Sequence, residues 1–134
     1  CNAQYSIAVN SATSALHIAC LALGVGSGDT VWTSPNTFVA SANCALYCGA
    51  EVDFVDIDPD TWCLRSDKLR KKLEDHKSAE KQLPKVVIPV HLSGQFCDMQ
   101  SIFQLGQQFG FKIIEDASHA IGRTYQDKPI GNCK

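Results

Sequence analysis

The sequence lacks the features that mark a membrane protein or a nucleic-acid-binding protein. Among its 134 residues no apolar run approaches the length of a membrane span, and no basic segment followed by an apolar one opens the chain. The formal net charge is only -2, and the basic residues are spread along the chain apart from the Lys68–Lys72 group. We therefore expect neither a membrane nor nucleic acid among its partners.

Cysteine is present, but the spacing that metal sites require is missing. The seven cysteines include no Cys-x-x-Cys pair, and they lie within ordinary apolar patterns, as Cys20 and Cys44 do. An odd number of cysteines in such positions is typical of reduced, buried side chains in a cytosolic protein. We expect a cytoplasmic protein with no metal site.

The two ends of the sequence also lack the character of natural termini. The chain begins at Cys1 rather than at a methionine, and it stops in the small polar run Gly131–Lys134. Its length is that of about one domain and is sufficient for a hydrophobic core. We expect the chain to be a piece of a longer protein.

Apolar strands and amphipathic helices alternate through most of the chain. The predicted strands are residues 5–9, 30–33, 51–57, 85–90 and 111–114, and the predicted helices are residues 12–23, 39–46, 67–74 and 99–109. Asp98 and Gly110 are expected to cap the last helix. Residues 76–84 are predicted to form an irregular surface connection, and residues 123–130 a hairpin that turns at Asp127 and Lys128. The alternation predicts an α/β fold with a mostly parallel sheet between two layers of helices.

The segment Gly24–Asp29 has glycines spaced as in a nucleotide-binding loop, but its position is reversed. It follows a predicted helix and precedes a predicted strand, whereas a dinucleotide-binding loop leads from a strand into a helix. We predict an ordinary turn between helix and strand here. This counts against a dinucleotide-dependent oxidoreductase.

Polar and aromatic residues gather where three predicted strands end. Ser11–Ser14 begin a helix, where unpaired N–H groups favour an anion, although simple hydroxyl capping is the more common arrangement. Thr37 and Phe38 precede the next helix, although a phenylalanine in such a position is more often a core residue. Asp116 and His119 follow the last strand, where an aspartate alone could simply turn the chain.

These three strand ends are expected to meet, because parallel sheets bind their ligands at the carboxyl ends of the strands. A phosphate, a flat ring and a ring nitrogen would satisfy the three groups together. Pyridoxal phosphate combines those parts, and its electron-sink chemistry needs an acid beside the pyridine nitrogen. Asp116, Ser118 and His119 are too close in sequence to form a hydrolase triad.

Four segments resemble, in order, the motifs of the sugar aminotransferases of the DegT/StrS type, which are fold-type-I pyridoxal-phosphate enzymes. They are Asn10–His17, Ser34–Asn43, Pro89–Gly94 and Glu115–Gly122. The resemblance covers nearly the whole chain, and the combination is specific although each motif alone is not. It implies that residues 1–134 are part of the cofactor-binding large domain of a homodimeric enzyme.

The resemblance also implies roles for individual residues. Thr13 and Ser14 would hold the cofactor phosphate through backbone and hydroxyl groups, and Phe38 would stack on the pyridine ring. Asp116 would be the catalytic residue that pairs with the pyridinium nitrogen, and a charged hydrogen bond of that kind is stronger than a neutral one. His119 matches a position that lies against the cofactor ring.

His91 and Ser93 end a strand on the same side of the predicted sheet as these residues. We assign them no role beyond contact with the substrate.

Within the family, the motifs are most similar to those of the aminotransferases of the pseudaminic acid pathway. Those enzymes aminate C4 of a UDP-linked 4-keto-6-deoxy-N-acetylhexosamine with glutamate as the donor. A UDP-sugar and an amino-acid donor are therefore the expected partners. The family also includes enzymes that make perosamine, aminoarabinose and antibiotic sugars.

The family pattern includes one element that this chain does not contain. The lysine that carries the cofactor as a Schiff base lies on a later strand in a Ser-Phe-His-x-x-Lys-like motif, and Lys134 does not lie in such a motif. The small C-terminal domain of these enzymes is absent as well, so we expect the fragment alone to be inactive. A sugar dehydratase of the same family, with histidine in place of that lysine, stays open as an alternative, as does a non-catalytic regulatory or binding homologue.

Overall fold

The computed structural model describes residues 3–131, and Cys1, Cys133 and Lys134 lie outside this range. Four parallel strands form one sheet in the order β2-β1-β3-β4. The strands are β1 (Thr30–Thr33), β2 (Glu51–Phe54), β3 (Val86–Ile88) and β4 (Lys112–Ile113). The helices are α1 (Ala12–Ala22), α2 (Ala40–Tyr47), α3 (Ser66–Ser78) and α4 (Met99–Phe109), with the short 3-10 helix η1 (Leu92–Gly94) after β3.

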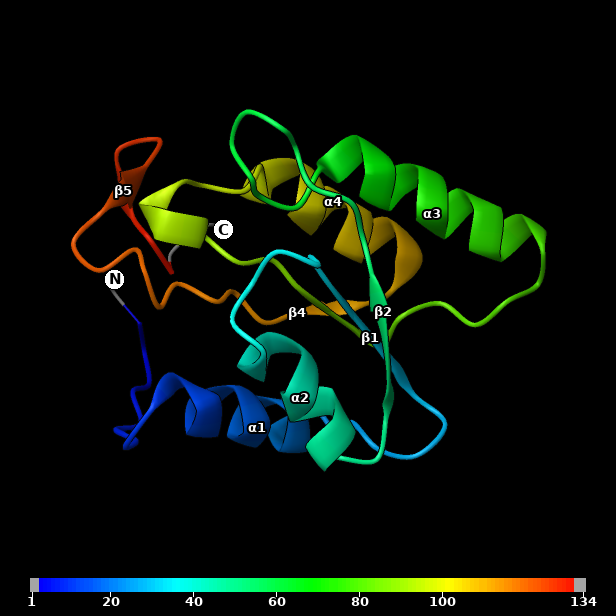
Figure 1. Ribbon diagram of the computed structural model, residues 1–134, viewed down its shortest axis with the longest axis horizontal. Coiled ribbons are helices and arrows are strands. Elements are labelled where there is room, and N and C mark those ends of the chain that lie inside the picture. Colours follow the sequence, from blue (N-terminus) through cyan, green and yellow to red (C-terminus); the bar gives the residue numbers. More distant parts are fainter. Residues whose placement is uncertain (1–2, 132–134) are drawn as a thin grey trace.

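The helices cover the sheet from both sides. Figure 1 shows α3 and α4 on one face and α1 and α2 on the other, so the described residues form three layers. This arrangement confirms the predicted α/β fold with a parallel sheet. The antiparallel hairpin of β5 (Thr124–Tyr125) and β6 (Lys128–Pro129) lies beyond the sheet.

Alternation along the two central strands divides the core into two parts. Val31, Val86 and Ile88 pack toward α1 and α2, whereas Trp32 and Val87 pack toward α3 and α4. All five side chains are buried, as expected for central parallel strands that are covered on both faces. Packing on both faces therefore fixes the positions of the strand ends relative to the helices.

The helix ends follow the sequence signals closely. Ser11 caps α1 by accepting a hydrogen bond from the N–H of Ser14, and Asp98 caps α4 by accepting from the N–H of Ser101. Gly110 ends α4 in the left-handed conformation, with φ of 84°. These caps confirm the predicted boundaries of the two helices.

The predicted strand at residues 5–9 is wrong. This segment has no strand partner among residues 3–131, and Tyr5 and Ile7 are 82% and 77% exposed. Its apolar composition suits a strand, but a strand requires a neighbouring backbone to satisfy its N–H and C=O groups. The segment is extended chain that leads to the cap of α1.

Helix α3 is longer than predicted and includes part of the expected surface connection. It continues to Ser78 because its last turn finds partners outside the helix. The ring of His76 packs edge-on against Trp32 at 4.8 Å between centroids, and Lys77 lies 5.8 Å from the ring of Phe109. These contacts compensate for the polar sequence of that turn.

Two turns differ from the prediction by a few residues. Strand β2 ends at Phe54 rather than at residue 57, because the carboxylate of Asp58 accepts hydrogen bonds from Asp60 and Thr61 and closes a loop. The hairpin turns at Gln126 and Asp127, whose φ angles are 49° and 62°. A two-residue hairpin loop of this kind needs positive φ at both central residues.

Within residues 3–131, no helix is both long and apolar enough to cross a membrane. The same residues contain no cluster of three or more histidine, cysteine or acidic side chains that could hold a metal ion.

The turn at Gly24–Asp29 joins α1 to β1 as predicted, and an ion pair holds it. Asp29 Oδ2 accepts hydrogen bonds from Gly26 N–H at 2.9 Å and from Lys85 Nζ at 2.8 Å. Lys85 Nζ also donates to the carbonyl of Gly24 at 2.6 Å. The pair therefore ties the start of β3 to this turn, and Lys85 with the Gly26 N–H lowers the pKa of Asp29.

We expect Asp29→Asn to lower the free energy of unfolding at neutral pH and to have less effect in acid. Because the folded state lowers the pKa of Asp29, its stabilisation is present above the unfolded value of about 4 and is lost as the pH falls through the folded pKa. Urea unfolding of both proteins from about pH 7 to about pH 3 measures the difference. In a Lys85→Met background the difference should shrink, and a difference that does not change with pH would contradict the role of the charge.

Candidate functional site

A pocket lies at the carboxyl edge of the sheet, between the start of α1, the start of α2 and the end of β4. Four of the five predicted site residues line it: Thr13, Phe38, Asp116 and His119. The remaining lining residues are Ala12, Leu16, Thr37, Ala40, Val90 and Ser118. The structure thus brings together the start of α1, which follows no strand, and the chain after β1 and β4, which are far apart in the sequence.

Asp116 is the buried acid of this pocket, with only 8% of its surface exposed. Its Oδ1 accepts hydrogen bonds from the hydroxyl and the N–H of Ser118, at 2.6 Å and 3.2 Å. Its Oδ2 accepts from the hydroxyl of Ser41 at 3.0 Å. A carboxylate has about four acceptor sites. Oδ2 therefore keeps capacity for one more donor, which a ligand in the pocket can supply.

The start of α1 presents backbone N–H groups to the same pocket. The first N–H groups of a helix have no partner within the helix, and the helix dipole adds positive potential there. Thr13 lines the pocket in this first turn. Ser14 is not among the lining residues, and its hydroxyl donates to Asn10 Oδ1 at 2.7 Å. Thr13 and the helix start are thus the groups available to an anion in the pocket.

Phe38 stands at the edge of the pocket with 68% of its surface exposed. It precedes α2, whose first buried residues Ala40 and Ser41 hold the backbone against the core. An aromatic ring that is exposed beside a polar pocket offers a flat apolar surface to a ligand ring. The predicted alternative, a core position for Phe38, is wrong.

His119 is oriented by the loop that follows β3. Its Nδ1 accepts a hydrogen bond from the N–H of Ser93 at 3.2 Å. A neutral imidazole that accepts at Nδ1 carries its proton at Nε2. Ser93 adopts a left-handed conformation with φ of 53°, which an L-residue rarely occupies. The imidazole of His119 can therefore donate from Nε2.

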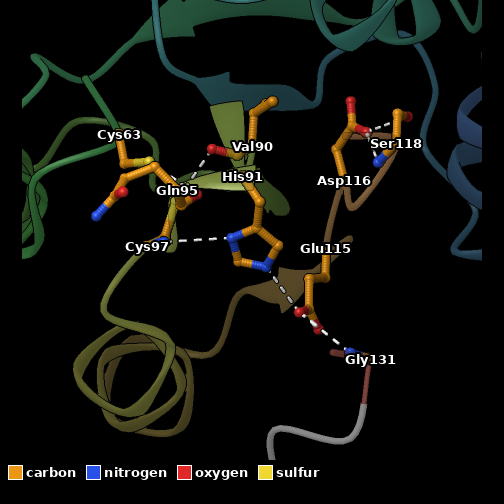
Figure 2. Close-up of polar contacts among 9 residues, drawn as sticks. All are labelled: Cys63, Val90, His91, Gln95, Cys97, Glu115, Asp116, Ser118 and Gly131. Carbon is orange, nitrogen blue, oxygen red and sulfur yellow. Dashed lines mark hydrogen bonds and ion pairs between the residues drawn. The ribbon is translucent and has the colours of Figure 1, made fainter. Parts of the chain in front are cut away.

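His91 does not reach the pocket, contrary to its expected contact with substrate. Its side chain is 0% exposed, and the ring lies on the side of the sheet that α4 covers. Nε2 of His91 lies 2.8 Å from Glu115 Oε1, and Nδ1 accepts from the N–H of Cys97 at 3.2 Å. Figure 2 shows Glu115 and Asp116 pointing in opposite directions from adjacent positions of the chain.

Two residues that hold Asp116 were not predicted. Ser41 donates to the carboxylate and lies within 2.9 Å of the hydroxyl of Thr37, so a chain of hydroxyls leads from the pocket wall to the acid. Ser118 lies in the motif Glu115–Gly122, which by itself assigns it no role. Ser41 lies in the first turn of α2 and Thr37 in the bend before it, so no helical spacing in the sequence indicates the pair.

The described cysteines are unpaired, and most of them are buried. Cys20, Cys44, Cys63 and Cys97 are buried, and Cys48 is half-buried. Contact with Cys63 and burial raise the pKa of Cys97, so it stays a thiol and donates to the carbonyl of Val90 at 3.3 Å. For these five residues the prediction of free thiols in apolar surroundings is confirmed.

Comparison with known proteins assigns the chain to a family. The model of the DegT/DnrJ/EryC1/StrS aminotransferase family matches residues 1–134, so the chain belongs to that family.

Individual relatives cover almost the whole of this chain. GDP-perosamine synthase of Caulobacter vibrioides is 40% identical over 132 residues, which are 98% of this chain and 34% of that protein. The spore coat polysaccharide biosynthesis protein SpsC of Bacillus subtilis is 42% identical over 130 residues, or 97% of this chain and 32% of that protein. The chain therefore spans about a third of the length of the curated relatives it matches.

A solved relative has the same fold and is known with its cofactor. Spr1654 of Streptococcus pneumoniae is 34% identical and superposes with a TM-score of 0.76 over 91% of this chain and 33% of that protein. It has been solved in a PLP form and in a PMP form.

Close packing at Gly94 holds His119 in place and generates a test. Gly94 has φ of 79°, and a Cβ there would lie 3.2 Å from the carbonyl of His119 and 3.3 Å from the guanidinium of Arg123. We expect Gly94→Ala to lower the free energy of unfolding by more than the roughly 1–2 kcal/mol cost of a left-handed alanine. Urea unfolding measures the loss.

Gly28→Ala is the matched control, because Gly28 has φ of 86° and nothing within 4 Å of its Cβ position. The difference between the two variants isolates the contact with residues 119 and 123. Equal losses would mean that Gly94 matters only for its backbone conformation.

Proposed function

We propose that the protein is a pyridoxal-phosphate-dependent aminotransferase acting on a nucleotide sugar. The observation that carries this proposal is the acid Asp116, which is buried in the pocket and keeps acceptor capacity there. Among residues 3–131 it has no ion-pair partner. A buried carboxylate without a cation is costly, and a protonated pyridine ring is a cation of suitable shape.

The residues of the pocket fit the parts of this cofactor. The N–H groups at the start of α1, with Thr13, would hold the phosphate as helix amino termini do. Ser14 donates its hydroxyl to Asn10, so it would join them only by giving up that partner. Phe38 would cover the ring, and Asp116 would accept a hydrogen bond from the protonated ring nitrogen. His119 would donate from Nε2 to a polar atom of the ring, because Ser93 occupies its Nδ1.

When bound, the cofactor supplies the electron sink through which an amino group is transferred. The protein residues named here act by position and charge. Asp116 would keep the ring nitrogen protonated and Phe38 would cover one face of the ring, while Ser41 and Ser118 orient the carboxylate. An aminotransferase of this family would carry the cofactor on a lysine, whereas the dehydratase has histidine in its place.

We further propose the substrate and the context of the enzyme. The substrate is a UDP-linked 4-keto-6-deoxy-N-acetylhexosamine, and glutamate supplies the amino group for a 4-amino sugar of a surface polysaccharide or flagellar glycan. The sequence motifs of the pseudaminic acid type support this choice. The names of the relatives, GDP-perosamine synthase and a spore coat polysaccharide protein, support a role in polysaccharide biosynthesis.

We also propose that residues 1–134 are part of the large domain of a cytoplasmic homodimer. The short span relative to its relatives supports the first point. Free thiols support the cytoplasm. The exposed apolar side chains of Ile18, Leu21 and Leu46 on α1 and α2 support a protein contact on that face.

We expect Asp116→Asn to weaken cofactor binding and nearly abolish turnover. A hydrogen bond between charged groups contributes about 1.5–3 kcal/mol, so affinity for pyridoxamine phosphate should fall about ten- to a hundredfold. Fluorescence titration of the protein expressed from its complete reading frame measures this. Asp127→Asn, in the exposed hairpin turn, is the matched control and should change nothing. Normal turnover of the Asp116 variant would contradict the role of this acid.

The reaction itself is tested with the same protein and two sugars. We expect glutamate and a UDP-linked 4-keto-6-deoxy-N-acetylhexosamine to give 2-oxoglutarate and a 4-amino sugar, and borohydride to fix the cofactor on a lysine. GDP-4-keto-6-deoxymannose is the competing substrate. Faster turnover of the GDP-sugar would assign a perosamine-type specificity. Loss of a sugar hydroxyl with no lysine adduct would assign the dehydratase branch instead.

A further inference from the structure

A buried histidine and a glutamate lie behind the acid of the proposed site, on the opposite face of the sheet. His91 Nε2 is 2.8 Å from Glu115 Oε1 (Figure 2). Neither residue lines the pocket. Glu115 also accepts a hydrogen bond from the N–H of Gly131 at 3.4 Å, so it links β4 to the chain after the hairpin. The proposed roles of the pocket residues do not use this pair.

The hydrogen bonds of His91 fix where its proton lies. Nδ1 accepts from the backbone N–H of Cys97, so the neutral ring has its proton on Nε2 and donates it to the carboxylate of Glu115. The ring of Phe96 packs edge-on against the imidazole at 5.8 Å between centroids. The imidazole is therefore held from three sides.

Backbone pairing connects this pair directly to Asp116. The N–H of His91 donates to the carbonyl of Asp116 at 3.0 Å, and the N–H of Asp116 donates to the carbonyl of Pro89 at 3.0 Å. Val90 and Asp116 form the last bridge between the ends of β3 and β4. A shift of the His91 backbone or of Glu115 must therefore move Asp116, since adjacent residues of one strand cannot shift independently.

We propose that His91 and Glu115 are positioning residues that set the place and the strength of the contact between Asp116 and the ring nitrogen of the cofactor. Their side-chain hydrogen bond holds the ends of β3 and β4 together beyond the last backbone pair. The negative charge of Glu115 also favours a cation near its neighbour. This inference rests on the proposed function, because it assumes the pyridine ring in the pocket.

The test compares two ligands that differ only in the ring nitrogen. Pyridoxamine phosphate and its deaza analogue, with C–H in place of the nitrogen, are titrated into the protein expressed from its complete reading frame. We expect wild type to prefer pyridoxamine phosphate by about tenfold or more, as a charged hydrogen bond requires. If wild type binds both equally, the proposed contact of Asp116 fails, and the positioning role fails with it.

His91→Asn and His91→Gln separate the two hydrogen bonds of the ring. Asparagine places its amide near Nδ1 and keeps an acceptor for Cys97, whereas glutamine reaches Nε2 and keeps a donor for Glu115. We expect His91→Asn to reduce the preference for the ring nitrogen at least about threefold, and His91→Gln to retain most of it. Glu115→Gln, which keeps the shape but removes the charge, should reduce the preference as well.

A purely structural role predicts a different result. His76→Asn is the matched control, because His76 donates from Nδ1 to the carbonyl of Gln82 and packs on Trp32 away from the pocket. It should lower stability without changing the ligand preference. If His91→Asn and Glu115→Gln weaken both ligands equally, the positioning role is overturned even though Asp116 still binds the nitrogen. If His91→Asn does not fold, the Glu115→Gln result decides alone.

Discussion

The bridge between Val90 and Asp116 is the interaction on which the site depends. It is the last pairing of two parallel strands, and it lies just where their hydrophobic sequences end. Because neighbouring residues of a strand point to opposite faces, this one register sends Asp116 toward α1 and α2 and Glu115 toward α4. A slip of one residue would exchange the two acids. The backbone pairing of Val90 with Asp116 therefore decides which acid faces each side of the sheet.

The two acids differ in their surroundings: Glu115 lies on the face that α4 covers, whereas Asp116 lines the pocket. Glu115 accepts hydrogen bonds from the imidazole of His91 and from the N–H of Gly131. Asp116 receives only hydroxyl and amide donors, from Ser41 and Ser118. Neutral donors orient a buried carboxylate but compensate less of its charge than a cation does. Asp116, which lines the pocket, is therefore suited to bind a cationic ligand.

Much of the fold and the neighbourhood of the site could be predicted from the sequence, because both depend on local patterns. Strands and helices showed the expected periodicity, and the topology of a parallel sheet brings strand ends together. The segment 5–9 was wrong because periodicity reports composition, whereas a strand also needs a partner. The role of Ser41 could not be predicted, because it is one of several small residues in α2. Nothing in that sequence distinguishes a serine that donates to a distant carboxylate from an ordinary helix residue.

His91 shows most clearly what the sequence leaves undetermined. Its place after a buried strand suggested the pocket, and only the register decides that its ring faces the other core. There the N–H of Cys97 donates to Nδ1 of His91, so the proton of the neutral ring lies on Nε2. Nε2 then contacts Glu115, the neighbour of Asp116 in the chain. The family pattern identifies which residues touch a ligand. The hydrogen bonds on the far side of the same strands determine how firmly the ligand-facing acid is held, because a backbone that is fixed on one face is fixed on both.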